Sequence, residues 1–357
     1  MRVLLPISLD RWRNPIATLL RACVEANPAI EFFSHANPFS EEDAILARSF
    51  WSLPNVLALS QRQLCCTRYD LVHTASITLH NQAAVIAAKA RSWGNCRYLA
   101  TVNLQVGPHD GKDWQLLRCA EHLADGLVSV SQAAGEGCIQ RCGDRYLGVI
   151  PNGFDPVYFD PSINDDEALP LSVRAMNPGS YALYVGALEP RKHPEMLVEL
   201  AKSNPDLTFV AAGYVHPEGR HFEPMMKSQP NLQWLGHVDR RCIRALLRRA
   251  GVFLFPSERE GLALSVIEAM GMGLPVIAQP KSSMPELIEH STNGALHDIS
   301  DHQAWSGSLR TFLQWSTEER AAFRKQARTA AIARFDWSVI GRRYGVLYRE
   351  IILQGDR

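Results

Sequence analysis

The chain alternates short apolar runs with longer segments in which apolar positions recur at helical spacing. Helical spacing is clear in Asn81 to Arg91 and in Trp114 to Ala124. The short runs include "YDLVHT", "RYLATVN" and "DGLVSVS" in the first half and "YALYVGAL", "LTFVAAG" and "VFLFPS" in the second. Such runs predict strands and the longer segments predict helices. Their alternation predicts an α/β protein with parallel sheets and helices on both faces.

The pattern is interrupted between Ser162 and Ser180, where the sequence is polar, and it restarts afterwards. A chain of 357 residues is also longer than a single core usually holds. We therefore predict two α/β domains, at residues 1–165 and 181–335, joined by a linker at residues 166–180. The last segment, residues 336–357, is an aromatic-rich helix that we expect to pack back toward the first domain.

Composition narrows the choice of partners. The 37 basic residues balance 37 acidic ones, so no overall field attracts nucleic acid, and any anion site must be local. The eight cysteines form no Cys-x-x-Cys pair, which favours reduced thiols in a cytoplasmic protein over a zinc site. No histidines are spaced as His-x-x-x-His and no Asp-x-Asp occurs, so we expect no metal. No apolar stretch is long enough to span a bilayer.

The first candidate site is "YVGALEPRKHPEMLVEL", which begins as a strand and continues as a helix. Gly186 ends the strand, and Arg191 and Lys192 fall in the turn before the helix. The guanidinium of arginine can donate two parallel hydrogen bonds to phosphate oxygens, and the ammonium of lysine supplies a compact positive charge. This turn is therefore a candidate phosphate site. The alternative is a solvated basic turn.

The second candidate is "FPSEREGLALSVIEAMGMGLPVIA", a loop followed by a helix. A helix that begins after Gly261 directs free N–H groups and its positive end at a ligand, which suits a diphosphate. Glu260 lies at the start of that helix and Glu268 about two turns further along it. Carboxylates accept hydrogen bonds from hydroxyls, so the pair could hold two sugar rings. Alternatively, Glu260 is a first-turn helix acid and Glu268 an exposed charge.

These segments also carry a resemblance. Together with "VIPNGFDPVYFDP", "AAGYV", "LGHV" and "MPELIEHSTNGAL", in that order, they resemble retaining glycosyltransferases of family 4, also called glycosyl transferases group 1. The likeness extends roughly from Asp125 to Gly294. It implies the GT-B architecture, in which two Rossmann-like domains face each other across a cleft.

The resemblance also implies roles for individual residues. Glu260 would bind hydroxyls of the donor sugar, and Glu268 would bind the ribose of the nucleotide. Lys192, with Arg191, would neutralise the departing diphosphate. The remaining donor-binding candidates are Gly186, Gly261, Leu262, Ala263 and Leu264 around the phosphates, and Gly236, His237 and Val238 near the base.

The sequence departs from the family pattern in its first domain. Asn14 and Pro15, on the acceptor side, replace a glycine-rich loop after the first strand. Many relatives have a histidine near the position of Asn103, whereas the nearest histidine here is His109. The contact with the donor sugar that this histidine makes therefore passes to Asn103 or His109, or is lost.

The resemblance implies a metal-independent hexosyltransferase of polysaccharide or glycoconjugate biosynthesis. It would move a sugar from a nucleotide-diphosphate sugar, its co-substrate, to a glycan, lipid-linked or small-molecule acceptor with retention of configuration, and would use no other cofactor. We expect it in the cytoplasm, or at the inner face of the membrane for a lipid-linked acceptor. The oligomeric state is not predicted.

The sequence supports three other interpretations to different degrees. A catalytically weak or inactive GT-B scaffold that binds a nucleotide sugar or glycan is the main alternative, because fold does not fix function. A dehydrogenase would need a Gly-x-Gly-x-x-Gly after a strand, which is absent. The basic helix "DRRCIRALLRRAG" suggests a peripheral membrane contact, but a solvated helix face is the more common explanation.

Overall fold

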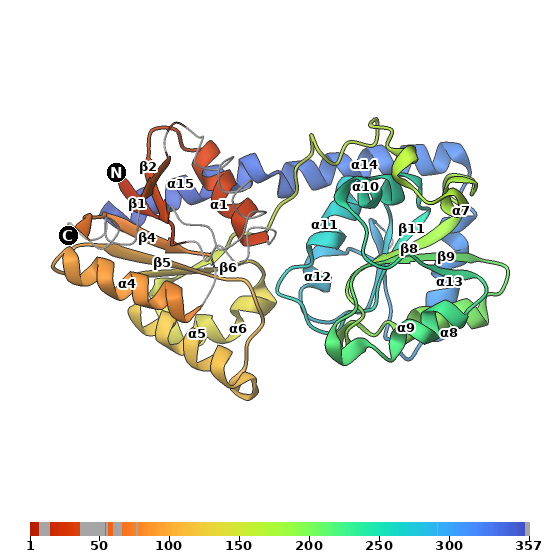
Figure 1. The fold of residues 1–357 in the computed structure, drawn as a ribbon, viewed down its shortest axis with the longest axis horizontal. Helices are drawn as coiled ribbons and strands as arrows, with labels where there is room; N and C mark the ends of the chain where they lie inside the picture. Colours follow the sequence, from red (N-terminus) through yellow and green to blue (C-terminus); the bar gives the residue numbers. More distant parts are fainter. Residues whose placement is uncertain are drawn as a thin grey trace. The chain divides into compact units, whose positions relative to one another are not determined.

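The chain divides into two α/β units. The computed structural model describes residues 1–6, 15–35, 54, 56–59, 66–75, 78–290 and 292–353. Unit 1 comprises Met1–Gly153 and Phe335–Arg357, and unit 2 comprises Phe154–Arg334 (Figure 1). Each unit contains a parallel sheet with helices on both faces, so the predicted α/β class with two Rossmann-like domains is confirmed.

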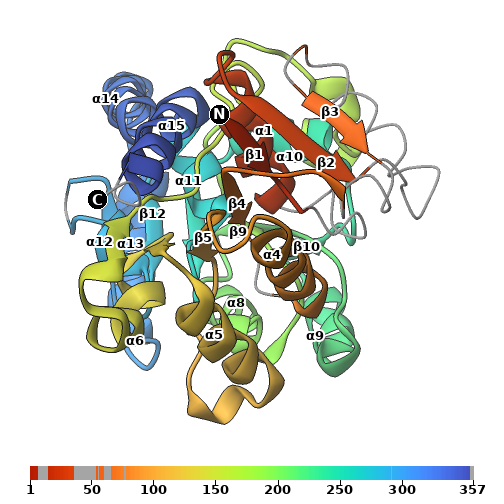
Figure 2. The same cartoon turned by 90° about the vertical axis from the view of Figure 1, so that its left-hand side faces the viewer.

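Unit 1 is built on a sheet of seven strands among the described residues, in the order β3-β2-β1-β4-β5-β6-β7. Helices α4, α5 and α6 cover one face, and α1 and α15 cover the other (Figures 1 and 2). The strands are β1 (Arg2–Leu4), β2 (Glu31–His35), β3 (Val56–Leu59), β4 (Leu71–Thr74), β5 (Arg97–Val102), β6 (Gly126–Ser129) and β7 (Tyr146–Val149). The helices are α1 (Pro15–Glu25), α4 (Leu79–Arg91), α5 (Lys112–Leu123), α6 (Gln132–Cys142) and α15 (Trp337–Leu353).

The C-terminal helix α15 completes unit 1 and packs beside α1. Buried polar groups fix its position: His73 Nδ1 lies 2.7 Å from Tyr348 Oη, and His73 Nε2 lies 2.9 Å from Thr101 Oγ1. Burial lowers the pKa of His73 to about 3, so the ring is neutral and donates from one nitrogen only. Close packing needs a glycine at position 345, where a Cβ would lie 1.7 Å from Asn27 Oδ1.

Unit 2 has six strands within the described residues, in the order β10-β9-β8-β11-β12-β13. Helices α8, α9 and α13 pack on one face around the buried Trp305 and Phe209, and α10 and α11 lie on the other (Figure 1). The strands are β8 (Tyr181–Val185), β9 (Thr208–Ala212), β10 (Leu232–Trp234), β11 (Val252–Phe255), β12 (Val276–Ala278) and β13 (Gly294–Leu296). The helices are α7 (Leu171–Arg174), α8 (Glu195–Ser203), α9 (Phe222–Ser228), α10 (Arg240–Arg249), α11 (Leu264–Gly271), α12 (Met284–Leu287), α13 (His302–Leu313) and α14 (Thr317–Phe335).

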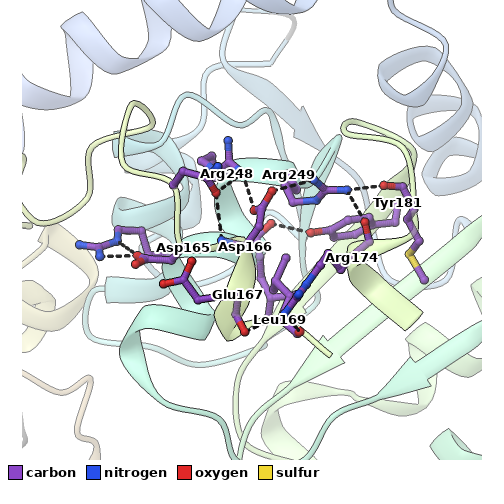
Figure 3. A network of polar contacts seen from close by, with 12 residues as sticks. Asp165, Asp166, Glu167, Leu169, Arg174, Tyr181, Arg248 and Arg249 are labelled. Atoms are coloured by element: carbon purple, nitrogen blue, oxygen red, sulfur yellow. Dashed lines mark hydrogen bonds and ion pairs between the residues drawn. The ribbon is translucent and has the colours of Figure 1, made fainter. Parts of the chain in front are cut away.

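The segment expected to be a linker packs instead on unit 2. Residues 154–180 all belong to that unit, so the boundary lies after Gly153 rather than after residue 165. The acidic pair in this segment explains the difference. Arg244 Nε donates to Asp165 Oδ2 at 2.6 Å. Asp166 accepts hydrogen bonds from Arg248 and Arg249 (Figure 3).

The same contacts revise the interpretation of the basic helix, now α10. Arg244 and Arg249 are buried against the 154–180 segment, while Arg240 and Arg241 are 65% and 56% exposed. The face of α10 that suggested a membrane contact is therefore largely an internal ion-pair surface. No helix in the described part of the chain is long and apolar enough to cross a membrane.

Candidate functional site

A short turn after β8 carries the two predicted phosphate-binding cations. Pro190–Lys192 form a single 3-10 turn, and His193 closes it in the left-handed conformation, with φ 46° and ψ 51°. Arg191 O accepts a hydrogen bond of 2.9 Å from Glu258 N, which joins this turn to the loop that follows β11. The two loops that the sequence singled out separately therefore lie side by side.

Three donors converge on one oxygen of Glu260. Lys192 Nζ, Arg191 Nη1 and Ser257 Oγ lie 2.7, 2.9 and 2.9 Å from Glu260 Oε1. The side chain of Glu260 is 15% exposed. Burial raises the pKa of Glu260, but the charges of Lys192 and Arg191 outweigh it and the net shift is below the usual value. Glu260 is therefore a carboxylate at neutral pH, held by two cations.

A second carboxylate balances this cluster. Arg191 Nε donates to Glu189 Oε1 at 2.6 Å. Burial lowers the pKa of Arg191, but Glu260 and Glu189 outweigh it and the net shift is upward. Two cations thus face two carboxylates, and both cations keep N–H donors beyond those that bind Glu260 and Glu189, which a phosphate group could use.

Helix α11 begins next to this cluster without a side-chain cap. Its N-cap is Ala263, whose side chain makes no capping hydrogen bond, so the first N–H groups are not claimed by a polar side chain there. Gly261, Leu262 and Ala263 are buried, and Leu264 is half-buried. This end of α11 has the backbone groups that an anion would need.

Glu268 lies one turn after Leu264 on the same face of α11. Its side chain is only 17% exposed, and its Oε1 lies 3.4 Å from Arg240 Nη2. Burial raises the pKa of Glu268 to about 7, and Arg240 offsets this only in part. The alternative interpretation of Glu268 as an exposed charge therefore fails, and a carboxyl group in this environment needs a partner when it ionises.

Glycines at the carboxyl ends of β8, β9 and β10 bring three loops together. Gly213 N donates to Gly236 O at 2.8 Å, and Gly186 N donates to Ala212 O at 3.0 Å. A Cβ on Gly213 would lie 1.8 Å from Gly186 O, so only glycine fits there. Beyond Gly236, His237 is exposed and Val238 is half-buried. Gly186 and the 236–238 loop thus share one edge of the unit 2 sheet.

The predicted residues of unit 1 form a separate set. Asn103 follows β5 directly, and its Nδ2 donates to Ala75 O. His109 is exposed in a 3-10 turn. Pro15 begins α1, whereas Asn14 lies outside the described residues. The amide of Asn103 is thus engaged by the backbone, and the ring of His109 is open to solvent.

Sequence reasoning missed several residues that support Glu260. Ser282 Oγ accepts from Glu260 N at 3.1 Å and donates to Glu260 O, and Ser282 itself has a positive φ of 53°. Ser257 and Glu189 were within reach of the sequence argument, since one precedes Glu260 by three residues and the other precedes the Pro190 turn. Ser282 gave no such signal, because it is 22 residues from Glu260 along the chain.

The comparisons with known proteins concern the family and the fold. Residues 173–330 match the model of the family described as Glycosyl transferases group 1. The matched range lies inside unit 2 and contains Lys192, Glu260 and Glu268. The resemblance inferred from the sequence is thereby confirmed over residues 173–330.

Relatives of known name extend this finding. The chain is 30% identical over 195 residues to an Escherichia coli UDP-Gal:alpha-D-GlcNAc-diphosphoundecaprenol alpha-1,3-galactosyltransferase, covering 51% of this chain and 50% of the relative. It is 30% identical over 142 residues to the Escherichia coli O-antigen chain mannosyltransferase B, covering 38% and 37%. The chain therefore spans half the length, or less, of these two relatives.

Similarity in fold covers more of the chain than similarity in sequence does. The structure of Anabaena Alr3699/HepE in complex with UDP and glucose matches with a TM-score of 0.77 and 18% identity, covering 98% of this chain and all of that one. A glycosyltransferase from Rickettsia africae matches with a TM-score of 0.78 and 17% identity, covering 99% and 98%. At such low identity the likeness shows the fold, which is GT-B.

Proposed function

We propose that this protein is a retaining glycosyltransferase of family 4. It transfers a hexosyl group from a nucleotide-diphosphate sugar to a glycan, lipid-linked or small-molecule acceptor. One observation carries the proposal: Glu260 is held by Lys192 and Arg191 next to the uncapped start of α11, within the residues that match the family model.

Unit 2 supplies the donor site in this proposal. Lys192, Arg191 and the first N–H groups of α11 bind the diphosphate, and Glu268 accepts hydrogen bonds from the ribose. The 236–238 loop, at the same sheet edge as Gly186, contacts the base. Two neighbours support a nucleotide donor, because one is named for UDP-Gal and the other holds UDP and glucose.

The reaction breaks the bond between the anomeric carbon and a diphosphate oxygen. The sugar gains oxocarbenium character, and negative charge grows on the departing diphosphate. Lys192, Arg191 and the α11 N-terminus then stabilise the charge where it develops. Because these groups already do this work, the proposal needs neither a metal ion nor a resident cofactor.

Retention follows from attack on the face that the leaving group vacates. A phosphate oxygen of the departing diphosphate takes the proton from the acceptor hydroxyl, and the acceptor oxygen forms the new bond to the anomeric carbon. Glu260 acts as a positioning group in this scheme, because its Oε1 is occupied by three donors. Its carboxylate also favours the positive charge on the sugar.

The acceptor and the compartment are part of the same proposal. A lipid-linked acceptor is supported by the diphosphoundecaprenol in the name of one relative. The seven cysteines among the described residues are all free thiols, which suits a reducing cytoplasm. A lipid-linked acceptor would then bring the enzyme to the inner face of the membrane.

A scaffold that binds a nucleotide sugar without turnover is the second candidate. The bond from the Asn103 amide to Ala75 O favours it, because one N–H of this side chain is then turned to the backbone rather than to a sugar. Both candidates require the unit 2 donor site, and they differ only in catalysis. An experiment must therefore separate binding from turnover.

The test is a thermal-shift panel of UDP, GDP and ADP, followed by measurement of nucleotide release from the matching sugar donors. Stabilisation by one nucleotide together with slow donor hydrolysis supports the transferase. Binding of one nucleotide with no turnover on any acceptor favours the scaffold. Failure of all three nucleotides to bind would remove the assignments of Lys192 and Glu268.

A further inference from the structure

Unit 1 contains a polar cavity of about 460 Å³ that the proposed activity does not use. This volume lies within the range of small-molecule sites. Three lining residues lie at the amino ends of strands: Arg97 begins β5, Asp125 directly precedes β6, and Arg145 directly precedes β7. The cavity is therefore at the opposite sheet edge from Asn103, which follows the carboxyl end of β5.

The lining of this cavity carries an excess of positive charge. Its basic members are Lys89, Arg97, Arg145 and His122, whereas Asp125 is the one acidic residue among the described residues that line it. The carboxylate of Asp125 is shared: Lys89 Nζ lies 2.6 Å from Oδ2, and Arg97 Nη1 lies 3.2 Å from Oδ1. One carboxylate thus faces two cations.

Arg145 adds a charge that no lining carboxylate cancels. Its Nη1 donates to the carbonyl oxygens of Glu121 and Ala124, at 2.7 and 2.9 Å, where α5 ends. These carbonyls fix the guanidinium but are formally neutral. Lys89, Arg97 and Arg145 together therefore exceed Asp125 by two charges, a surplus that fits a phosphate group.

A strongly exposed tryptophan lies in the turn between two of these cations. Trp93 stands midway between Lys89 and Arg97 in the chain, is 86% exposed, and has a positive φ of 52°. Solvent exposure of so large an apolar ring is costly in water, and the left-handed backbone adds strain. Tryptophan at this kind of position is typical of residues that enter a membrane interface.

Helix α4 extends this apolar surface. Leu79 and Ile86 are 67% and 53% exposed, and Trp93 follows Ile86 at the same seven-residue spacing. The residues between them on this face, Ala83, Ala87 and Ala90, are also exposed. No acidic residue occurs between Leu79 and Arg97. Lys89 follows Ile86 by three residues, so the apolar stripe adjoins the cationic cavity.

We propose that this part of unit 1 docks on an anionic phospholipid surface. The exposed face of α4 and Trp93 enter the interface, and the cavity receives a headgroup phosphate between Lys89, Arg97 and Arg145. The positive lining complements the negative lipid, which a neutral apolar partner would not require. Vesicle binding is measured without a sugar donor, so its outcome is independent of the proposed transferase activity.

The test is co-sedimentation of the full chain with vesicles. Vesicles of phosphatidylcholine mixed with phosphatidylglycerol should bind the protein at least about tenfold more strongly than phosphatidylcholine alone, and added salt should weaken the binding. Equal binding to both vesicles, or binding to neither, would overturn the proposal.

Matched variants locate the surface. Trp93→Asn should weaken vesicle binding about tenfold and leave the fold intact, because asparagine tolerates the left-handed backbone. Leu171→Asn, which removes a 78% exposed apolar residue from unit 2, should leave it unchanged. His122→Glu adds a carboxylate at the cavity and should weaken binding more than the uncharged His122→Gln does. Wild-type binding by Trp93→Asn and His122→Glu would overturn the assignment.

Two other outcomes would replace the lipid with another occupant. Stabilisation by inorganic phosphate that His122→Glu abolishes, without vesicle binding, would show that the cavity takes a free phosphate. Self-association in analytical ultracentrifugation that Trp93→Asn abolishes, again without vesicle binding, would show that α4 meets a second copy of the chain. Either result would overturn the membrane proposal.

Discussion

Lys192, Arg191 and Ser257 share one oxygen of Glu260, so this carboxylate is fixed before any ligand arrives. The serine contributes a neutral hydrogen bond, and the two cations contribute charge-assisted ones. Ser282 holds the backbone of the same residue on both sides. The position of Glu260 is therefore set by its neighbours rather than by substrate, as a preorganised site requires.

Replacement of Glu260 tests that preorganisation. Glu260→Gln keeps the size of the side chain but removes the charge that orients Lys192 and Arg191, so turnover should fall by about a hundredfold or more. Nucleotide release from the sugar donor measures the change. The exposed Glu218→Gln on the 3-10 turn after β9 is the matched control and should behave as wild type. Full turnover by Glu260→Gln would disprove the assignment.

In the proposed donor site, Glu268 should make nucleotide binding depend on pH. Its pKa in the folded, unliganded protein is about 7, raised from 4.5 by burial. The contribution of Glu268 to the stability of the folded protein is therefore fully present below the pKa that this residue has in the unfolded chain. This contribution is lost as pH rises through about 7. Ribose hydroxyls donate to the ionised form, so nucleotide affinity should rise about tenfold from about pH 6 to about pH 8.

Calorimetric titration of a nucleoside diphosphate over this range provides the measurement. Glu268→Gln carries no titrating group at this position, so its affinity should lose the tenfold change that Glu268 contributes. The variant also serves as the reference for ionisation of the nucleotide itself. The same pH dependence in both proteins would show that Glu268 does not face the ligand.

At the scale of elements, the ion pairs between α10 and the 154–180 segment decide which unit that segment joins. Asp165 and Arg244 are 7% and 9% exposed, so both charges are largely removed from water. Such a pair adds little over an apolar one, but removal of one partner leaves the other charge buried and uncompensated. The ion pair between Asp165 and Arg244, here called the clamp, is therefore sensitive to single substitutions.

Asp165→Asn should destabilise unit 2 by about 3 kcal/mol, as measured by urea unfolding at neutral pH. Burial raises the pKa of Asp165, but Arg244 and Arg241 outweigh it and the net shift is downward. Its contribution is therefore present above the unfolded pKa and is lost as pH falls below about 4, a loss that the variant should not show. Asp206→Asn, which breaks an exposed pair with Arg310, is the control and should change little. An equal effect of both substitutions would contradict a buried clamp.

The elements show what a sequence can and cannot predict. Strand runs such as "VFLFPS" and the cationic turn at Arg191 and Lys192 were identifiable because their signals are local. The linker assignment failed because polarity was taken as solvent exposure, whereas Asp165 pairs with an arginine 79 residues away. The association of Glu260 with Lys192, 68 residues apart, came only from the family resemblance. Contacts of this kind depend on strand order, which local patterns do not encode.

At the scale of the whole molecule, each unit has its own core, so the two should unfold in separable transitions. A nucleotide that binds unit 2 should raise only the transition of that unit. The polar contacts of α15 with the unit 1 sheet give a means of perturbing unit 1 alone.

Tyr348→Phe removes the hydroxyl group that meets His73 Nδ1 and leaves a buried ring nitrogen without this partner. Unit 1 should lose about 1 to 3 kcal/mol, while nucleotide affinity in unit 2 stays unchanged. Scanning calorimetry with and without nucleotide measures both effects. Tyr214→Phe, at a 55% exposed position of unit 2, is the control. A shift of the nucleotide-stabilised transition in Tyr348→Phe would show that α15 stabilises both units.

The packing of α15 on unit 1 has a consequence for co-translational folding. Unit 2 is complete at Arg334, but unit 1 still lacks α15 at that point, although its sheet was synthesised first. Domains generally fold as units during synthesis, the N-terminal one first. Here unit 1 can complete its fold only after α15 has been synthesised, which is after all of unit 2. Truncation or proteolysis within α15 would therefore destabilise unit 1, whose sheet is synthesised first, and would leave unit 2 intact.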